Sequence, residues 1–154
     1  MMRVEQIEDN RSQICREVLE TLPEWFGLPD SLTAYAEAAE TLPMLGCIVQ
    51  GQVVGMLTLK RHSDWNTEIA VMGVLPDWHR KGVGEALVQA AIGYAQADGC
   101  RLLTVKTLAE HHPDPGYAAT RRFYHAMGFR LFEEFPELWG ADNPCALCVL
   151  PVSD

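Results

Sequence analysis

Apolar residues recur along this chain at two spacings, and the change from one spacing to the other marks the predicted elements. Near the start, Ile14, Val18 and Leu22 lie four residues apart, which is the period of a helix with one buried face. The segment 10–13, Asn-Arg-Ser-Gln, resembles a capping box and predicts where this helix begins. Pro23 cannot continue the hydrogen bonding of a helix, so it is expected to end this one.

The pattern then changes to short apolar runs of strand length. Residues 44–49 and 53–59 form two such runs, and the turn Gln-Gly-Gln at 50–52 separates them, which is typical of a β-hairpin. Gly55 lies inside the second run and indicates a bulge there. A third run at 68–74 ends shortly before Pro76 and predicts another strand.

The remaining segments complete an alternating order of strands and helices. Ser31 is able to cap a second helix, and Gly99 and Gly128 follow periodic segments where a glycine commonly ends a helix. This order predicts an α/β fold, with a mixed central sheet of six to seven strands flanked by about four helices, in a single domain over residues 1–154. The expected strands are 2–7, 44–49, 53–59, 68–74, 102–105, 129–135 and 146–152; the expected helices lie between 10 and 23 and at 31–40, 82–97 and 118–127; loops are expected at 22–29 and 111–116.

Composition and charge narrow the classes of partner. The formal net charge is −9 with no basic stripe, which argues against binding of nucleic acid through its phosphates and is compatible with a cationic substrate such as an amine. No apolar run approaches the ~20 residues needed to cross a bilayer. The first residues lack the apolar stretch of a signal peptide, so we expect a cytoplasmic protein.

The cysteines and paired histidines do not predict a metal site. Cys145 and Cys148 have the C-x-x-C spacing, but no second pair completes a zinc site, so both are interpreted as small buried apolar residues. His111 and His112 lie in a proline-rich loop without carboxylate or cysteine spacing, which favours ordinary surface groups over ligands. We therefore expect no metal.

The segment 74–88, Val-Leu-Pro-Asp-Trp-His-Arg-Lys-Gly-Val-Gly-Glu-Ala-Leu-Val, runs from a predicted strand through a tight loop into a predicted helix. The first amides of a helix have no carbonyl partner and favour anions. Gly82 and Gly84 let a phosphate approach those amides, and Arg80 and Lys81 add positive charge. Leu87 stands where the dinucleotide-binding pattern has its third glycine, and no Gly-Lys-Ser/Thr follows as in a P-loop.

A second segment, 121–129, Arg-Arg-Phe-Tyr-His-Ala-Met-Gly-Phe, places Tyr124 four residues before a helix-ending glycine and an aromatic residue. In this order and with this gap, the two segments resemble the GNAT (GCN5-related) family of N-acetyltransferases over about residues 44–135. The family has Gln or Arg where this chain has His79, beside Arg80. It favours an asparagine that hydrogen-bonds the cofactor seven residues before the tyrosine, and this chain has Tyr117 there.

The resemblance implies a GNAT-like fold and acetyl-CoA as the cosubstrate. In this family the strand before the loop splays from its neighbour, and the pantetheine arm pairs with the exposed backbone, here that of Met72, Gly73 and Val74. The loop amides from Arg80 through Glu85 would hold the pyrophosphate. The implied cofactor-binding residues are Met72, Gly73, Val74, His79, Arg80, Lys81, Gly82, Val83, Gly84, Glu85 and Tyr117.

Acetyl transfer to an amine needs a base and an acid. An alkyl ammonium has a pKa near ~10.4 and cannot attack a thioester until it loses a proton. Glu68 is the candidate base, because some family members carry their catalytic glutamate at this distance before the glycines; the alternative is a solvent-facing carboxylate at a strand end. Tyr124 is the candidate acid for the leaving thiolate; the alternative is a tyrosine packed in the core, a place for which Phe123 looks better suited. A backbone N–H near Val74 could stabilise the thioester oxygen.

The sequence is compatible with more than one function and with more than one role for several residues. The primary hypothesis is an N-acetyltransferase acting on a primary amine of a small molecule or peptide; the alternatives are a non-catalytic acyl-CoA-binding sensor or regulatory module and an unrelated nucleotide-binding protein. Trp25, Phe26, Trp65 and Trp139 either line an acceptor pocket or pack in the ordinary way. Arg121 and Arg122 either reach a CoA phosphate or form surface salt bridges. An exposed last strand is able to pair across a homodimer.

Overall fold

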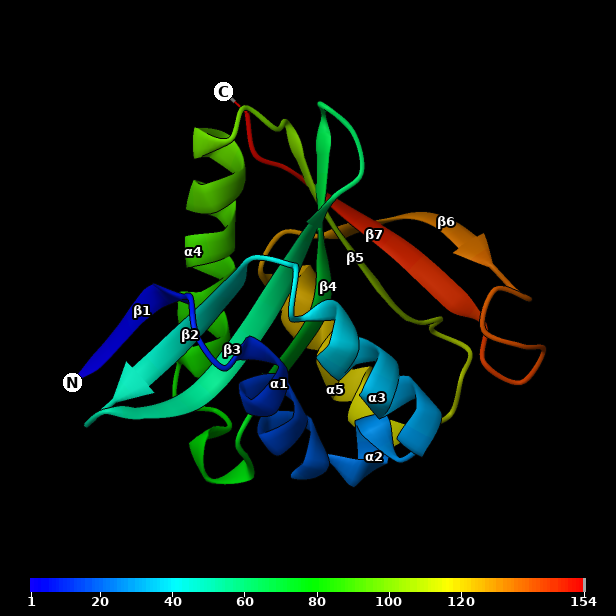
Figure 1. Ribbon diagram of the computed structural model, residues 1–154. Helices are drawn as coiled ribbons and strands as arrows, with labels where there is room; N and C mark the ends of the chain where they lie inside the picture. The colour runs from blue at the N-terminus through cyan, green and yellow to red at the C-terminus, as the bar shows by residue number, and fades with distance from the viewer. Residues whose placement is uncertain (154) are drawn as a thin grey trace. The chain divides into compact units, whose positions relative to one another are not determined.

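The computed structural model describes residues 1–153, which form seven strands and five α-helices (Figure 1). In chain order these are β1 (Met2–Ile7), α1 (Arg11–Glu20), α2 (Pro23–Phe26), α3 (Pro29–Ala38), β2 (Met44–Val49), β3 (Gln52–Arg61), β4 (Asn66–Val74), the 3-10 turn η1 (Pro76–Trp78), α4 (Val83–Ala97), β5 (Leu102–Leu108), α5 (Pro115–Ala126), β6 (Arg130–Phe135) and β7 (Cys145–Pro151).

The chain divides into two compact units. The first unit comprises residues 1–60 and 69–94, and the second comprises residues 61–68 and 95 onward.

In the first unit, the strands lie in the order β1-β2-β3-β4. β1 and β2 pair antiparallel, and so do β2 and β3. Cys47 lies opposite Gly55 whereas the next residue, Ile48, lies opposite Val53, so Val54 is the extra residue of a bulge. The bulge predicted at Gly55 is therefore present, one residue earlier.

Helix α1 buries the predicted face against this sheet. Cys15, Val18 and Leu19 are almost fully buried and pack in one cluster with residues of β2, β3 and β4. Gly73 of β4 lies directly under the helix, since a Cβ there would meet Val18 Cγ1 at 2.9 Å. The absence of a side chain at Gly73 thus sets how closely α1 approaches β4.

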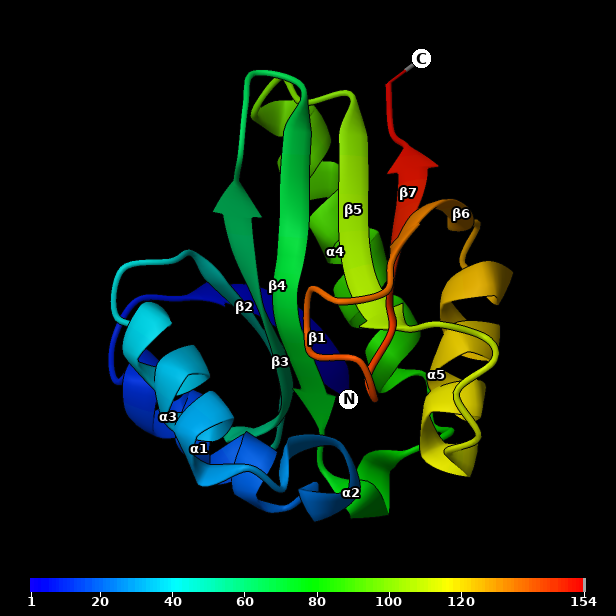
Figure 2. The same ribbon diagram turned by 90° about the vertical axis from the view of Figure 1, so that its right-hand side faces the viewer.

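Helix α4 packs on the opposite face of the same strands, while α1 and α3 lie together on the first face (Figure 2). The contact point is Gly55 of β3, where a Cβ would meet Val83 Cγ1 at 2.8 Å and Leu87 Cδ1 at 3.1 Å. This close approach places the first turn of α4 near the end of β4. The loop 75–82 connects these two elements.

In the second unit, the strands lie in the order β5-β7-β6 and both pairs are antiparallel. Leu131 pairs with Cys148 and Glu133 with Leu147, so Phe132 is the extra residue of a bulge in the edge strand β6. Helix α5 packs against β5, and the buried Phe129 follows it after Gly128, whose φ of 107° ends the helix as predicted.

The predicted helix boundaries were wrong in the N-terminal third. Helix α1 ends at Glu20, before Pro23, and Pro23 instead begins the one-turn helix α2 in a segment predicted as loop. Helix α3 begins at Pro29 rather than after Ser31. Proline is favoured in the first turn, where its missing N–H would have no partner in any case. Asn10 precedes α1 in the left-handed conformation, and its side chain caps none of the described amides, so the predicted capping box does not form.

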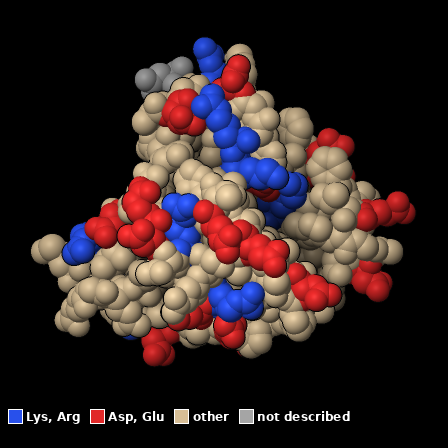
Figure 3. Space-filling view, in the orientation of Figure 1, with Lys and Arg blue, Asp and Glu red and all other residues tan. Residues whose placement is uncertain are grey.

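The surface is acidic, as the net charge of −9 requires. Asp and Glu side chains are spread over much of the face drawn in Figure 3. The longest described helix, α4, has 15 residues and falls short of a bilayer span, as do the other described helices.

Candidate functional site

The loop between β4 and α4 has a backbone that only a few residue types adopt easily. After η1, Arg80 has a φ of 61° and Gly82 has a φ of 85°, so two residues of the loop are left-handed. Helix α4 starts at Val83, and the Ala86 amide donates to the Gly82 carbonyl at 3.0 Å. The amides just before Ala86, at the start of the helix, have no preceding carbonyl of the helix to bond.

The space above this helix start is open. A Cβ placed on Gly82 would meet no described heavy atom within 4 Å outside its chain neighbours, and Arg80, Lys81 and Glu85 are exposed. Free amides, the positive end of the helix dipole and two cationic side chains together favour an anion here. Lys81 lies over the Trp78 ring, 5.4 Å from its centroid, which holds this charge near the loop.

His79 ties the loop to the end of β4. Its Nε2 lies 2.7 Å from the Val74 carbonyl oxygen, and its ring meets the Trp25 ring edge-on at 6.2 Å. His79 was predicted to contact the cofactor; the structure gives its imidazole a partner inside the chain. The three predicted pantetheine-binding residues lie in the last third of β4, where Gly73 also serves the packing of α1.

Glu68 lies in the second unit and is buried, with 9 % of its side chain exposed. Its Oε1 is 2.7 Å from His62 Nε2, and its Oε2 is 2.9 Å from Lys106 Nζ. The alternative of a solvent-facing carboxylate is therefore wrong. Both oxygens are engaged because β5 brings Lys106 beside Glu68 and the turn after β3 brings His62 to it from six residues earlier.

His62 was not predicted as a site residue. It lies in the turn between β3 and β4, where its amide donates to the Asn66 carbonyl at 2.9 Å. A histidine six residues before a candidate base, in the segment between the predicted strands 53–59 and 68–74, was the available signal. It was missed because the separation of two side chains across a turn depends on the turn length, which the pattern of apolar residues does not define.

Tyr124 lies in α5 and is 6 % exposed. Its ring packs edge-on against Phe129 at 5.5 Å and tilted against Phe123 at 5.3 Å. Tyr124, not Phe123, is the buried member of this pair, so the predicted assignment of the core position was wrong. Burial raises the pKa of the Tyr124 hydroxyl, and Cys148 and Tyr117 act in the same direction, so the hydroxyl is protonated at neutral pH.

The start of α5 is fixed by its own sequence and by Arg121. Asp114 caps the helix, accepting from the Gly116 amide at 2.7 Å, and Pro115 is its first residue, so the predicted loop 111–116 ends earlier than expected. Arg121 Nη1 donates to the carbonyls of Leu108 and Ala109 at 3.0 and 3.1 Å. Arg121 thus holds the loop after β5, which neither of its predicted roles described. Tyr117 lies in the first turn of this helix.

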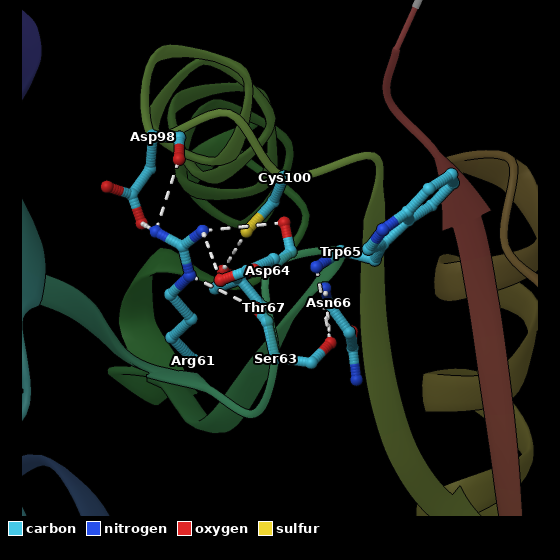
Figure 4. Close-up of polar contacts among 8 residues, drawn as sticks. All are labelled: Arg61, Ser63, Asp64, Trp65, Asn66, Thr67, Asp98 and Cys100. Atoms are coloured by element: carbon cyan, nitrogen blue, oxygen red, sulfur yellow. Dashed lines mark hydrogen bonds and ion pairs between the residues drawn. The ribbon is translucent and has the colours of Figure 1, made fainter.

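The tryptophans differ in their surroundings. Trp25 packs against the core of the first unit, as does Phe26. Trp65 is 57 % exposed, and the Arg101 guanidinium lies 4.6 Å from its ring centroid. Trp65 belongs to the turn between β3 and β4, which Arg61 fastens to Asp98 at 2.8 Å (Figure 4). The Trp65 ring thus contacts a side chain of the chain itself, in a turn that a salt bridge holds in place. This favours the interpretation of Trp65 as ordinary packing.

The cysteines carry no bond to each other. Cys145 is buried and Cys148 is half-buried, and all five cysteines are free thiols. Within residues 1–153, no group of three or more His, Cys, Asp or Glu side chains is arranged to hold a metal ion.

Comparison with known proteins places this geometry in a family. The model of the acetyltransferase (GNAT) family matches residues 6–129. No curated protein matches the chain in sequence. Among solved structures, a GNAT-family protein from Desulfovibrio desulfuricans is similar over 99 % of this chain and 100 % of its own, with 18 % identity and a TM-score of 0.85.

Two further structures share the fold. The ribosomal-protein-S18-alanine N-acetyltransferase from Escherichia coli has 19 % identity and a TM-score of 0.78, covering 100 % of this chain and 96 % of its own. An aminoglycoside 6′-N-acetyltransferase complexed with coenzyme A has 15 % identity and a TM-score of 0.77, covering 99 % and 98 %.

These likenesses confirm the predicted fold class, a mixed sheet of six to seven strands with about four helices; residues 1–153 contain seven strands and five α-helices, the one-turn α2 being the additional helix. The family match extends over most of the chain and includes both the loop before α4 and the segment around Tyr124. The chain belongs to the GNAT family of acetyltransferases.

Proposed function

We propose that this chain transfers the acetyl group of acetyl-CoA to a primary amine of a small molecule or peptide, by direct attack of the amine on the thioester. The observation that carries the proposal is the open, left-handed loop at Arg80 and Gly82 in front of the start of α4. The first amides of a helix have no carbonyl partner within that helix. Similar structures include one that holds coenzyme A, and enzymes named for an aminoglycoside and for an alanine of a ribosomal protein. These names support both classes of amine acceptor.

The residues of the loop fit a diphosphate. The backbone amides from Arg80 through Glu85 would bind its oxygens, and the side chains of Arg80 and Lys81 would balance its charge. Because Gly82 has no neighbour above it, the diphosphate has room to approach the backbone. The backbone of Met72, Gly73 and Val74 would hold the pantetheine arm. The His79 imidazole already bonds the Val74 carbonyl, and we assign His79 the role of holding that strand end in place.

The base and the acid are assigned to the second unit. Glu68 would help to remove the proton from the ammonium group of the acceptor. It is a carboxylate that His62 and Lys106 hold in place. Tyr124 would protonate the leaving thiolate, and its raised pKa means that the hydroxyl still carries its proton at neutral pH when the thiolate forms. Tyr117 stands at the position that contacts the cofactor in the family, and we retain it as a cofactor-contacting residue.

The test is an acetylation assay with a panel of amines. Acetyl-CoA is incubated with the protein and with aminoglycosides, polyamines or peptides with a free N-terminus, and the free thiol released is followed over time. Release that depends on one acceptor class supports the proposal. Binding of acetyl-CoA without release in any mixture would instead favour the sensor or regulatory module. Stabilisation by ATP or NAD but not by CoA would refute both.

Two further predictions about the protein in the cell accompany this proposal. We retain the cytoplasm as the expected location. The last strand of the chain, β7, pairs with β5 and β6 on its two sides, so the exposed last strand expected from the sequence was wrong. A homodimer is still retained, because the edge strand β6 exposes Leu131 and Phe132. Sedimentation of the purified chain would show one or two copies and so decide the second point.

A further inference from the structure

His62, Glu68 and Lys106 form a connected group with one end buried and the other reaching solvent. Glu68 lies between the two cations, at 2.7 Å from His62 Nε2 and 2.9 Å from Lys106 Nζ. Only 9 % of the Glu68 side chain is exposed, compared with 36 % of His62 and 31 % of Lys106. A substrate amine therefore has readier access to the imidazole than to the carboxylate.

The contact with Glu68 decides which tautomer His62 adopts. An ionised carboxylate only accepts hydrogen bonds, and the ammonium of Lys106 donates to the other oxygen of Glu68. The imidazole nitrogen facing Glu68, Nε2, must then carry a hydrogen and donate it. In a neutral imidazole the second nitrogen, Nδ1, is left with its lone pair. The arrangement yields a histidine whose second nitrogen is a proton acceptor and whose ring is held by the carboxylate behind it.

We propose that His62 is the catalytic base of this chain and that Glu68 is its positioning residue. The inference rests on the proposed acetyl transfer and identifies the group through which Glu68 acts. Lys106 donates to the second oxygen of Glu68 and so keeps the carboxylate oriented. Carboxylate–histidine pairs position and stabilise the imidazole in the same way in other enzymes that use histidine as a base.

The proton balance of the reaction shows what His62 does. His62 Nδ1 takes one proton from the ammonium group, and the amine nitrogen then bonds to the thioester carbonyl carbon. As the C–S bond breaks, Tyr124 gives its proton to the sulfur and regains one from the nitrogen. The imidazolium releases its proton to water. One ammonium ion and one thioester thus give one amide, one thiol and one proton, and the partly exposed His62 is placed to release that proton.

The other ionisable groups near this trio do not replace His62. Cys145 senses both Lys106 and Glu68, but burial raises the pKa of its thiol to about 11, so it is neutral at pH 7. Arg61 precedes His62 and bonds Asp98 at 2.8 Å, with Asp64 at 3.8 Å from its other nitrogen. Among the described residues, the imidazole has one hydrogen-bond partner, Glu68, and Lys106 acts on it through that carboxylate.

The experiment compares His62→Asn, His62→Ala and Glu68→Gln with the wild type, using the acceptor found in the amine panel. The exposed His111→Asn is the matched control, because it removes a histidine outside the trio. We expect His62→Asn to lower kcat/KM at pH 7 by about 10²–10⁴-fold, the usual contribution of a general base, with the Kd for CoA unchanged. The deficit should shrink as the pH approaches the pKa of the acceptor amine, because a free amine needs no base.

Chemical rescue separates the base from a structural residue. Added imidazole should restore activity to His62→Ala, with rates that rise with the pKa of substituted imidazoles, and should restore less when Glu68→Gln is also present. If His62→Ala does not fold, the pH profile of His62→Asn gives the same decision. An active wild type whose kcat/KM and pH profile survive His62→Asn would overturn the inference while leaving acetyl transfer intact. A wild type that acetylates no amine would overturn the proposed function, and this inference with it.

Discussion

Gly82→Ala tests whether the loop before α4 binds the diphosphate. Gly82 has a φ of 85° and no described heavy atom within 4 Å of an added Cβ. The substitution therefore introduces backbone strain without a steric clash. Gly51, in the turn between β2 and β3, has a φ of 79° and equally open surroundings. Gly51→Ala is thus a control that carries the same strain at a position without a proposed ligand.

The similar backbone and surroundings of Gly82 and Gly51 determine the expected changes in stability and in the Kd for CoA. A left-handed backbone costs a residue with a Cβ roughly 1–2 kcal/mol, and neither position adds an overpacking cost. Both variants should therefore lose about 1–2 kcal/mol of the free energy of unfolding. At Gly82 the loop can relieve the strain by turning its amides away from the anion. A loss of about 1.4 kcal/mol of binding free energy is a tenfold rise in Kd. We expect a rise of about this size for CoA with Gly82→Ala and none with Gly51→Ala.

Two measurements decide the outcome. Urea denaturation gives the free energy of unfolding of each variant, and calorimetric titration gives the Kd for CoA. Pantetheine lacks the diphosphate, so its binding should be the same in both variants, which locates the defect at the phosphates. Equal Kd values for CoA in the two variants, at equal stability, would refute the assignment of the loop as the diphosphate site.

Three further predictions concern the acid, the pH dependence of stability and the packing of α1. Tyr124→Phe should lower kcat by about 10²–10⁴-fold while leaving the Kd for CoA unchanged, and an unaltered rate in the thiol-release assay would remove the proposed acid. Burial raises the pKa of Cys15 and of Cys145 from 9.0 to about 11, so the folded chain keeps protons that the unfolded chain loses; the contribution of these two thiols to stability should be constant below pH 9 and fall between pH 9 and 11 by about 1.4 kcal/mol per pH unit for each thiol, as urea denaturation across that range would show. Gly73→Ala would place a Cβ 2.9 Å from Val18 Cγ1 and should lower the free energy of unfolding by about 1–3 kcal/mol. Because Val18→Ala removes the methyl that this Cβ would meet, Gly73→Ala should cost less in the Val18→Ala background. A double-mutant cycle measures this difference, and strict additivity would count against the contact.

Local patterns predicted most of the elements correctly. The hairpin around the turn at 50–52 and the long helix from Val83 were recognisable because periodicity, turn residues and the helix-ending Gly99 all lie within one segment. The starts of α3 and α5 were misplaced although Pro29 and Pro115 mark both of them. Proline in the first turn of a helix and proline in a loop read alike unless the helix that follows is recognised first.

The sequence by itself determined the parts of the candidate site that are contiguous in the chain: the glycine loop leading into α4 and the segment around Tyr124. Only the tertiary structure decided that Tyr124 rather than Phe123 is buried, and that Glu68 is enclosed by His62 and Lys106. The physical reason is that such contacts depend on strand register and on how closely elements pack. A shift of one residue in a strand would turn Glu68 to the other face, and no local pattern of apolar and polar residues specifies that register.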